Sequence, residues 1–209
     1  MRIGMDKGAR RQQLLTSARD VFAKRGYHAA KIEDIVSAAG VARGTFYLYF
    51  EDKRAILEEI IDRVLARIGM TILRVDPHDR ARTVEDQILE NVRRIVGMLV
   101  LDPATTKILL SDAMGVDPAF DRKLQAFNDE LGNLLDESLR DGQKLGIVAP
   151  GDTRLYAVLI VGALREMLVH VVRGDAAPDV DALVDGFYGF LTGGCLRVSA
   201  PARPPSARC

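Results

Sequence analysis

Side chains able to read or grip a nucleic acid are concentrated in one short stretch near the N-terminus of this 209-residue chain. They are Arg43, Thr45, Tyr47 and Tyr49. The planar fork of an arginine matches the O6 and N7 acceptors of guanine, and hydroxyl groups suit phosphate oxygens. For Arg43 a plain phosphate contact is an equal alternative, and for Tyr47 the alternative is a surface aromatic at a helix end. These residue types indicate contact chemistry on DNA.

The stretch from residue 32 to residue 50 has the pattern needed to position these side chains. Its first apolar residues recur at the spacing of one helix face, and they are Ile32, Ile35, Val36 and Ala39. Gly40 follows as a residue that adopts a positive φ without steric cost, so one helix ends there and another begins at a steep angle. In the second helix, Phe46 and Phe50 are spaced i, i+4 and belong to a core. The pattern predicts a helix-turn-helix with the polar side chains on its other faces.

Further helices are expected on both sides of this motif. Residues 10–25 show one apolar helix face and end at Gly26, so they form a first helix that completes a three-helix head. A long helix starts after Glu51 and Asp52, two acids suited to a helix N-terminus, and keeps a paired apolar row as far as Ile68. Such a helix is long enough to leave the head and enter a body.

The rest of the chain predicts a helical body without strands, because β-branched and polar residues nowhere alternate over a useful length. Its helices are expected at 83–101, 103–114, 118–144, 152–173 and 180–198. Thr83 with Asp86, at the start of the first of these, resembles a capping box with Asp in place of the usual Glu. The fold class is therefore all-α, with an N-terminal helix-turn-helix head and a helical body for effector binding and dimerisation. We expect the head to span 1–52, the body 53–199 and a disordered, proline-rich tail 200–209.

The charge is unevenly distributed, although the formal net charge of the whole chain is zero. Residues 1–54 hold eleven lysines and arginines against six acids, a balance of +5, so the remainder carries −5. A basic end on an acidic body fits a protein that meets phosphate with one end only. The charge distribution thus supports double-stranded DNA as the partner of the head.

The residues from Asp34 to Leu57, DIVSAAGVARGTFYLYFEDKRAIL, resemble the TetR/AcrR family of transcriptional regulators. The resemblance extends over about residues 10–60 and implies an all-α homodimer that binds a palindromic operator and releases it when a small molecule enters the body. Repression is the commoner outcome in that family. Its recognition-helix positions fall on Arg43, Gly44, Thr45 and Tyr47, and its phosphate contact at the start of the next helix falls on Lys53.

Three positions depart from the family pattern. Lys31 and Ala42 stand where the family commonly has Thr and Ser, whose hydroxyls cap the two helices or contact phosphate, and a lost cap costs about 1 kcal/mol. Lys31 can still reach phosphate as a point charge. Val36 stands where a smaller residue is preferred. The expected DNA-binding set is Lys31, Ala42, Arg43, Gly44, Thr45, Tyr47, Tyr49 and Lys53.

Two C-terminal helices predict an interface with a second copy of the chain. Residues 155–164 are a run of ten apolar residues, so helix 152–173 must be covered on more than one side. Each interior glycine of a helix costs about 1 kcal/mol relative to alanine, which close helix packing would offset. Helix 180–198 contains four of them: Gly186, Gly189, Gly193 and Gly194. Both features favour a four-helix interface in a two-fold homodimer, with packing inside one chain as the alternative.

A small-molecule effector is expected between the helices of the body, and its identity is not encoded in any recognisable motif. Glu166 and His170 are spaced i, i+4 and could pair to read a polar group, although a structural pair is the favoured interpretation. Methionines could line an adaptable pocket but are more often ordinary core. The candidate pocket residues are Asn91, Met98, Met114, Phe127, Tyr156, Glu166, Met167 and His170.

Other function classes have less support. An enzyme is disfavoured because His28, His78 and His170 lie far apart and no metal-ligand spacing, Gly-x-Ser-x-Gly or phosphate-binding glycine loop occurs, so no catalytic residue, cofactor or metal is expected. An architectural or partner-binding protein with the same head but no effector stays as an alternative. The charged N-terminus and the short apolar run predict a soluble cytoplasmic protein without a membrane segment.

Overall fold

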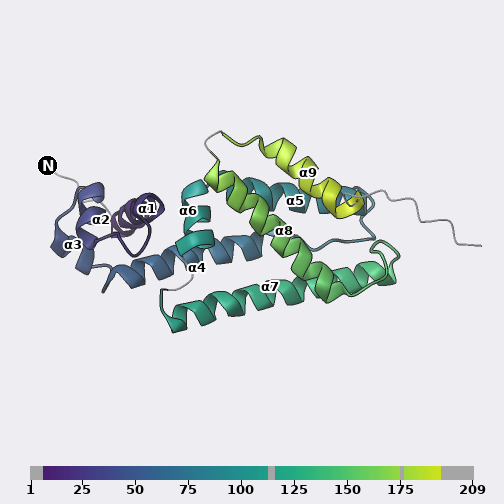
Figure 1. Ribbon diagram of the computed structural model, residues 1–209, viewed down its shortest axis with the longest axis horizontal. Coiled ribbons are helices and arrows are strands. Elements are labelled where there is room, and N and C mark those ends of the chain that lie inside the picture. The colour runs from purple at the N-terminus through teal and green to yellow at the C-terminus, as the bar shows by residue number, and fades with distance from the viewer. Residues whose placement is uncertain (1–6, 113–115, 175–176, 194–209) are drawn as a thin grey trace, which may run out of the picture.

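The computed structural model describes residues 7–112, 116–174 and 177–193, and all regular secondary structure in these ranges is helical. The elements are α1 (Lys7–Arg25), α2 (Ile32–Ala39), α3 (Arg43–Tyr47), α4 (Lys53–Thr71), α5 (Val84–Val100), α6 (Pro103–Lys107), the π-helix η1 (Ile108–Asp112), α7 (Pro118–Lys144), α8 (Thr153–Arg173) and α9 (Val180–Gly193). The head of α1, α2 and α3 lies at one end of an elongated molecule, and α4 runs from it into the body (Figure 1). The all-α prediction is confirmed.

The head is a small core closed by α1 packing on α2. Its largest side chains are buried completely or almost completely, and they include Leu14, Phe22, Ile35, Phe46 and Phe50. The rings of Phe46 and Phe50 lie 5.8 Å apart between centroids, so the i, i+4 pair faces inward as the spacing predicts. With these aromatic rings in the core, α3 is held at a fixed angle and its remaining faces are free for contacts outside the head.

α4 links the head to the body along one continuous apolar stripe. Asp52 caps the helix, because its Oδ1 accepts a hydrogen bond of 2.7 Å from the backbone N–H of Ala55. The buried residues of α4 are Ile56, Leu57, Ile60, Ile61, Val64, Leu65 and Ile68, the row read from the sequence. The stripe is buried first against α1 and then against α5, α6 and α7, so a displacement of α4 moves surfaces in both parts.

The body packs in helix pairs around a second part of the same core. α7 lies against α8, and α5 lies against α9, while α6 contacts α1, α5 and α8 (Figure 1). Completely or almost completely buried side chains from several elements meet here: Val96, Ile108, Phe120 and Val184. The sequence placed α5, α7 and α8 within one residue of their observed ends, which is inside the usual uncertainty of helix boundaries.

One predicted helix differs from the observed backbone. Residues 103–114 were expected to form a single α-helix, but α6 ends at Lys107 and the chain continues as a π-helix over 108–112. A π-helix admits an extra residue into one turn, and a 3.6-residue apolar period does not reveal such a local widening. Met114, the end of the predicted helix 180–198 and the predicted tail 200–209 lie outside the described residues.

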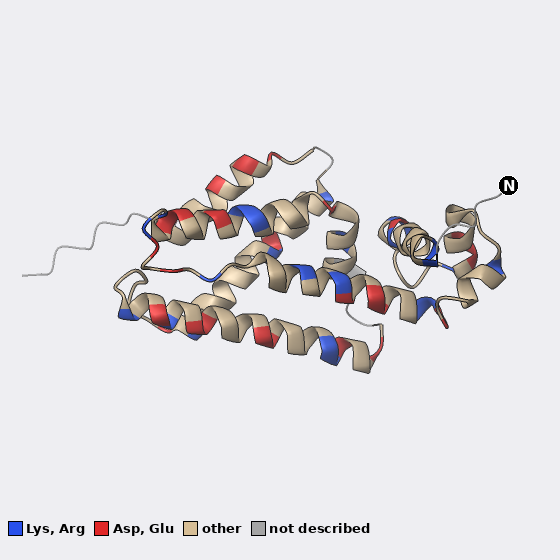
Figure 2. Cartoon of the chain, turned by 180° about the vertical axis from the view of Figure 1, so that it is seen from behind, with Lys and Arg blue, Asp and Glu red and all other residues tan. Residues whose placement is uncertain are grey.

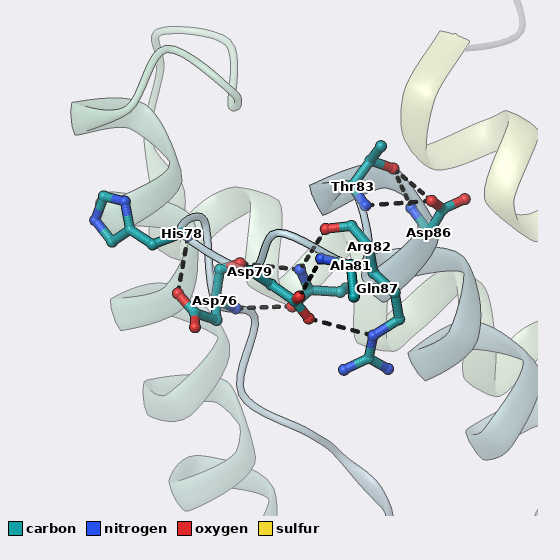
Figure 3. Close-up of polar contacts among 8 residues, drawn as sticks. All are labelled: Asp76, His78, Asp79, Ala81, Arg82, Thr83, Asp86 and Gln87. Carbon is teal, nitrogen blue, oxygen red and sulfur yellow. Dashed lines mark hydrogen bonds and ion pairs between the residues drawn. The ribbon is translucent and has the colours of Figure 1, made fainter.

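Side chains of α5 hold the linker between α4 and α5. Gln87, which is 7% exposed, accepts a hydrogen bond of 2.8 Å from the backbone N–H of Asp76 and returns one of 2.9 Å to its carbonyl oxygen (Figure 3). Asn91, one turn further, bonds both backbone groups of Leu73 at 2.9 and 2.7 Å. At the helix start, Thr83 and Asp86 form the expected capping box, with bonds of 3.1 and 3.2 Å. These contacts anchor the linker to α5.

Candidate DNA-binding interface and effector region

The turn between α2 and α3 has the geometry of a helix C-cap. Gly40 adopts a φ of 62°, its N–H donates to the carbonyl oxygen of Ser37 at 3.1 Å, and the N–H of Val41 donates to that of Val36 at 3.0 Å. These crossed bonds satisfy carbonyls that the helix end would leave open, and they require the left-handed conformation that glycine adopts at little cost. The turn therefore sets the angle at which α3 leaves the core.

The outward part of α3 carries the predicted contact residues. Arg43 and Gly44 are exposed, Tyr47 is 46% exposed, and Thr45 and Tyr49 are half-buried. A Cβ added to Gly44 would meet no atom within 4 Å, so packing inside the chain does not require a glycine here. The open surface at Gly44 is consistent with close approach of a backbone or groove wall from outside.

Arg43 is held by two neighbours, one of which the sequence reading missed. Its Nη1 lies 2.5 Å from Oε1 of Glu33 on α2, and its Nη2 donates to the hydroxyl of Tyr47 at 3.3 Å. The hydrogen bond to Tyr47 and the charge of Glu33 raise the pKa of the Arg43 guanidinium. Glu33 orients the guanidinium but also competes with an anionic ligand for it. Glu33 stands in the first turn of α2, and nothing in the sequence pattern linked it to Arg43.

Lys31 and Ala42, which depart from the family pattern, stand at the starts of α2 and α3, and the two helix starts are capped differently. Ala42 supplies no side-chain cap to α3. At Lys31 the side chain also makes no capping bond, but the carboxylate of Asp34 accepts a hydrogen bond of 3.0 Å from the backbone N–H of Lys31. That carboxylate also lies 2.8 Å from the guanidinium of Arg25. The start of α2 thus keeps one of the two capping-box bonds, the one from the Lys31 N–H to Asp34. This bond fixes the backbone of Lys31, whose side chain is exposed.

Lys53 lies deeper in the head than its predicted role suggests. Its Nζ donates to the carbonyl oxygens of Tyr27, His28 and Ala30 at 2.6, 3.4 and 2.9 Å, and it lies 4.3 Å from the centroid of the Tyr27 ring. Burial lowers the pKa of this ammonium. The side chain therefore joins α4 to the loop after α1. A phosphate contact at Lys53 stays a prediction, and it would share the ammonium with these carbonyls.

We expect Lys53→Met to destabilise the head. Methionine keeps the apolar stem but removes the donor for three carbonyl oxygens, and a hydrogen bond from a charged group contributes about 1.5–3 kcal/mol. Urea unfolding followed by circular dichroism should show a free energy of unfolding lower by about that amount. Lys31→Met, in the same head but outside this cluster, is the matched control and should change stability much less. Equal stability of the two variants would contradict the assignment.

Charged side chains fasten α4 to helices on either side of it. Arg11 of α1 makes a two-pronged contact with Glu59, with Nε 3.1 Å from Oε1, and this contact holds the pKa of the Glu59 carboxyl below its usual value. On the other side, Nε of Arg54 lies 2.5 Å from Asp117, the residue that caps α7. Acidic and basic residues alternate along α4 in Figure 2. These ion pairs hold α4 against α1 of the head and against the start of α7 in the body.

Most of the predicted effector-pocket residues are spread over different surroundings. Met98, Phe127 and Met167 are partly buried and pack against the core. The side chain of Asn91 is bonded to the linker backbone, and the Tyr156 hydroxyl donates to the carbonyl oxygen of Pro150 at 3.1 Å. In this conformation the side chains of Asn91 and Tyr156 bond to loop backbone. Contact of either residue with an effector stays a prediction, and it would require these hydrogen bonds to break.

Glu166 and His170 are exposed on α8. Glu166 contributes to a shallow cleft of about 150 Å³ together with Leu110, Arg165, Val169, Val172 and Arg173. The cleft mixes three charged side chains with three apolar ones, which suits an amphipathic rather than a purely apolar molecule. The two arginines were not among the predicted pocket residues. Their position in the C-terminal half of α8, after a run of ten apolar residues, is the signal that could have identified them.

α8 and α9 leave apolar side chains uncovered. On α8, Leu155, Val158 and Leu159 are between 52% and 63% exposed, and on α9 Phe190 is 44% exposed. α8 is long and apolar enough to cross a bilayer by length and composition, with a mean hydropathy of 1.8, yet only 11% of that window is buried. Arg165 lies within the helix, and a charge at mid-membrane costs at least about 2.5 kcal/mol. An exposed apolar surface of this size is typical of a contact site for another molecule.

The comparisons with known proteins agree with this geometry. Residues 14–60 match the family model described as bacterial regulatory proteins, tetR family. The fatty acid metabolism regulator protein of Bacillus subtilis (strain 168) is 26% identical over 184 residues, which cover 87% of this chain and 93% of that protein. The solved structure of the fatty acid degradation regulator FadR from Bacillus halodurans is 30% identical, with a TM-score of 0.73 and coverage of 90% of this chain and 97% of that one. FadR from Bacillus subtilis, solved in complex with stearoyl-CoA, is 25% identical, with a TM-score of 0.70 and coverage of 88% and 99%.

Proposed function

Because this chain belongs to the TetR family of transcriptional regulators, we propose that it is a cytoplasmic repressor that a fatty acyl-CoA thioester releases from DNA. In this proposal it binds a palindromic operator as a homodimer. The observation that carries the proposal is the outer surface of α3, where Arg43, Gly44 and Tyr47 are exposed on a helix that Phe46 fixes to the core. α3 (residues 43–47) lies within the segment 14–60 that matches the family model.

The contacts proposed for α3 divide into reading and positioning. Arg43 reads a base edge in the major groove, and Thr45, Tyr47 and Tyr49 bind phosphates or sugars near it. Gly44 lets the helix approach the groove wall. Lys31 and Lys53 add phosphate contacts at the starts of α2 and α4, and Ala42 contacts DNA at the start of α3. In a dimer, the two half-sites should lie about 34–36 Å apart, one helical turn of DNA, or a multiple of that.

The proposed homodimer uses α8 and α9. The exposed residues Leu155, Val158 and Leu159 share one face of α8 and would be covered by the same helices of a second copy. Gly186 and Gly189 on α9 support close approach, because a Cβ added to either would meet, within 4 Å, no atom of the described residues beyond its own stretch of helix. Packing inside one chain therefore does not explain these glycines, which weakens the alternative of a purely intramolecular role.

The proposed effector class comes from a relative of similar length. FadR from Bacillus subtilis was solved with stearoyl-CoA, and it aligns with this chain across nearly its full length. An acyl-CoA joins a long apolar chain to a phosphate-bearing group, which matches an apolar body with charged clefts. Release follows if the ligand binds more tightly to dimers whose heads are wrongly spaced for the operator, and the shift is limited by that difference in affinity.

Selection of bound fragments from random DNA tests the proposal, run with the purified protein alone, with stearoyl-CoA, and with coenzyme A as the control. We expect an enriched palindrome that is lost with stearoyl-CoA and kept with coenzyme A. No enriched palindrome would overturn the regulator proposal and favour an architectural role. A palindrome kept in all three samples would overturn only the effector class. In a purified transcription assay, the operator placed over a promoter should lower transcript yield until stearoyl-CoA is added.

A further inference from the structure

A cleft of about 210 Å³ lies where the head meets the body, between α1, α4 and α6. Its lining residues are Gln12, Leu15, Thr16, Arg19, Ile60, Arg63, Val64, Arg67, Asp102 and Thr105. Apolar side chains of α1 and α4 form part of the lining, and polar groups from all three helices complete it. The cleft has room for several water molecules, each of which occupies about 30 Å³ in the liquid. It is therefore large enough for a small polyatomic anion.

The lining carries three guanidinium groups and one carboxylate. Nη1 of Arg19 lies 3.7 Å from Oδ1 of Asp102, and Nη1 of Arg67 lies 3.7 Å from its Oδ2. Both distances exceed the usual 2.7–3.2 Å of an N–H···O hydrogen bond. Asp102 thus attracts two cations at distances too long for a hydrogen bond, and its Oδ1 caps α6 by accepting from the N–H of Thr105 at 3.3 Å. Arg19 meanwhile donates from Nε to Asp20 at 2.9 Å.

The third guanidinium is already oriented. Arg63 donates from Nη1 to the amide oxygen of Gln12 at 2.6 Å and from Nη2 to Glu59 at 2.7 Å. These bonds hold the planar group across the α1–α4 boundary, beside the apolar Val64. Preorganised guanidinium groups bind phosphate oxygens with paired hydrogen bonds, which makes arginine the preferred residue for such sites.

We propose that this cleft binds a phosphate-bearing anion, such as the diphosphate group of a metabolite. Of the three guanidinium groups, Arg19 also pairs with Asp20 and Arg63 with Glu59. Arg67, whose one ion pair among the described residues is the long contact with Asp102, is the group with donors left for an anion. DNA is not the source of the phosphate, because α6, which lines the cleft, belongs to the body, while α3 lies at the outer end of the head (Figure 1). An anion bridging Arg19 of α1 and Arg67 of α4 would strengthen the contact between head and body.

Inorganic pyrophosphate is the probe for this site, titrated calorimetrically into the purified full-length protein in low-salt buffer without DNA or acyl-CoA. We expect one saturable site per chain. Arg67→Gln should weaken binding about tenfold or more, the loss expected for a charge-assisted hydrogen bond. Asp102→Asn should tighten binding several-fold, because asparagine still caps α6 but no longer competes for the guanidinium groups. Arg93→Gln, at an exposed arginine of α5, is the control and should bind as the original protein does.

The gain in Asp102→Asn is the decisive readout, since a variant that merely damaged the fold would not bind more tightly. Weaker or unchanged binding in Asp102→Asn, equal losses in Arg67→Gln and Arg93→Gln, or no saturable binding at all would overturn the proposal. So would a salt dependence of DNA binding whose log–log slope falls by about 0.9 in Arg67→Gln, because Arg67 would then contact DNA phosphate. The pyrophosphate titrations are made without operator and effector, so their failure leaves the proposed regulator function standing.

Discussion

Leu159→Arg is expected to convert the protein from dimer to monomer and to lower its affinity for a palindromic operator by about 100-fold or more. Leu159 is 54% exposed on α8, beside Val158 at 63%. If a second copy covers this face, the substitution buries an unpaired charge against its symmetry mate, and a buried unpaired charge destabilises by several kcal/mol. Two linked heads gain about 10²–10⁴ in affinity over one head, so most of that gain disappears with the dimer.

Light scattering and operator titration measure the two effects in the same samples. Met70→Arg is the matched control, because Met70 is a 72% exposed apolar residue of α4 outside the proposed interface. It should remain dimeric and bind the operator normally. If Leu159→Arg kept the mass of a dimer, or if both variants dissociated alike, α8 would not form the interface and another surface would have to join the two chains.

Arg43→Ala is expected to remove the preference of the protein for its operator over unrelated DNA by about tenfold to 100-fold. A bidentate arginine–guanine contact contributes about 1–3 kcal/mol of discrimination, and the loss should concentrate on one base pair of each half-site. Non-specific affinity should change little. Lys53 differs, because a phosphate contact there would weaken binding to all sequences alike and reduce the slope of affinity against salt.

Titrations with the operator, with single-base variants of it and with random DNA at several salt concentrations test the role of Arg43. Arg93→Ala, an exposed arginine on α5, controls for loss of positive charge alone. Glu33→Gln is an informative companion, since it frees the Arg43 guanidinium from its ion pair and should raise affinity without removing the preference. Equal loss of specific and non-specific binding in Arg43→Ala would make Arg43 a phosphate contact.

The sequence by itself determined the helices and the corner that joins two of them. Apolar residues at 3.6-residue spacing predicted α1, α2, α4, α5, α7, α8 and α9, because a helix that buries one face must repeat it each turn. Gly40 identified the turn, since a left-handed residue at a helix end is a local requirement. Thr83 and Asp86 identified a helix start for the same reason. Each of these signals lies within a few residues of the feature it predicts.

The tertiary structure alone decided which polar groups meet. Lys53 reaches carbonyl oxygens more than twenty residues away, and Asn91 bonds a linker that the sequence left unplaced. The guanidinium groups of Arg19 on α1 and Arg67 on α4 both approach the carboxylate of Asp102 at the start of α6. Periodicity identifies the face of a helix but does not reveal which helix packs on it or at what distance. The partners of a long, flexible charged side chain are therefore set by the packing of the core beneath it. The DNA contact of α3 and the dimer face of α8 and α9 stay predictions from the sequence.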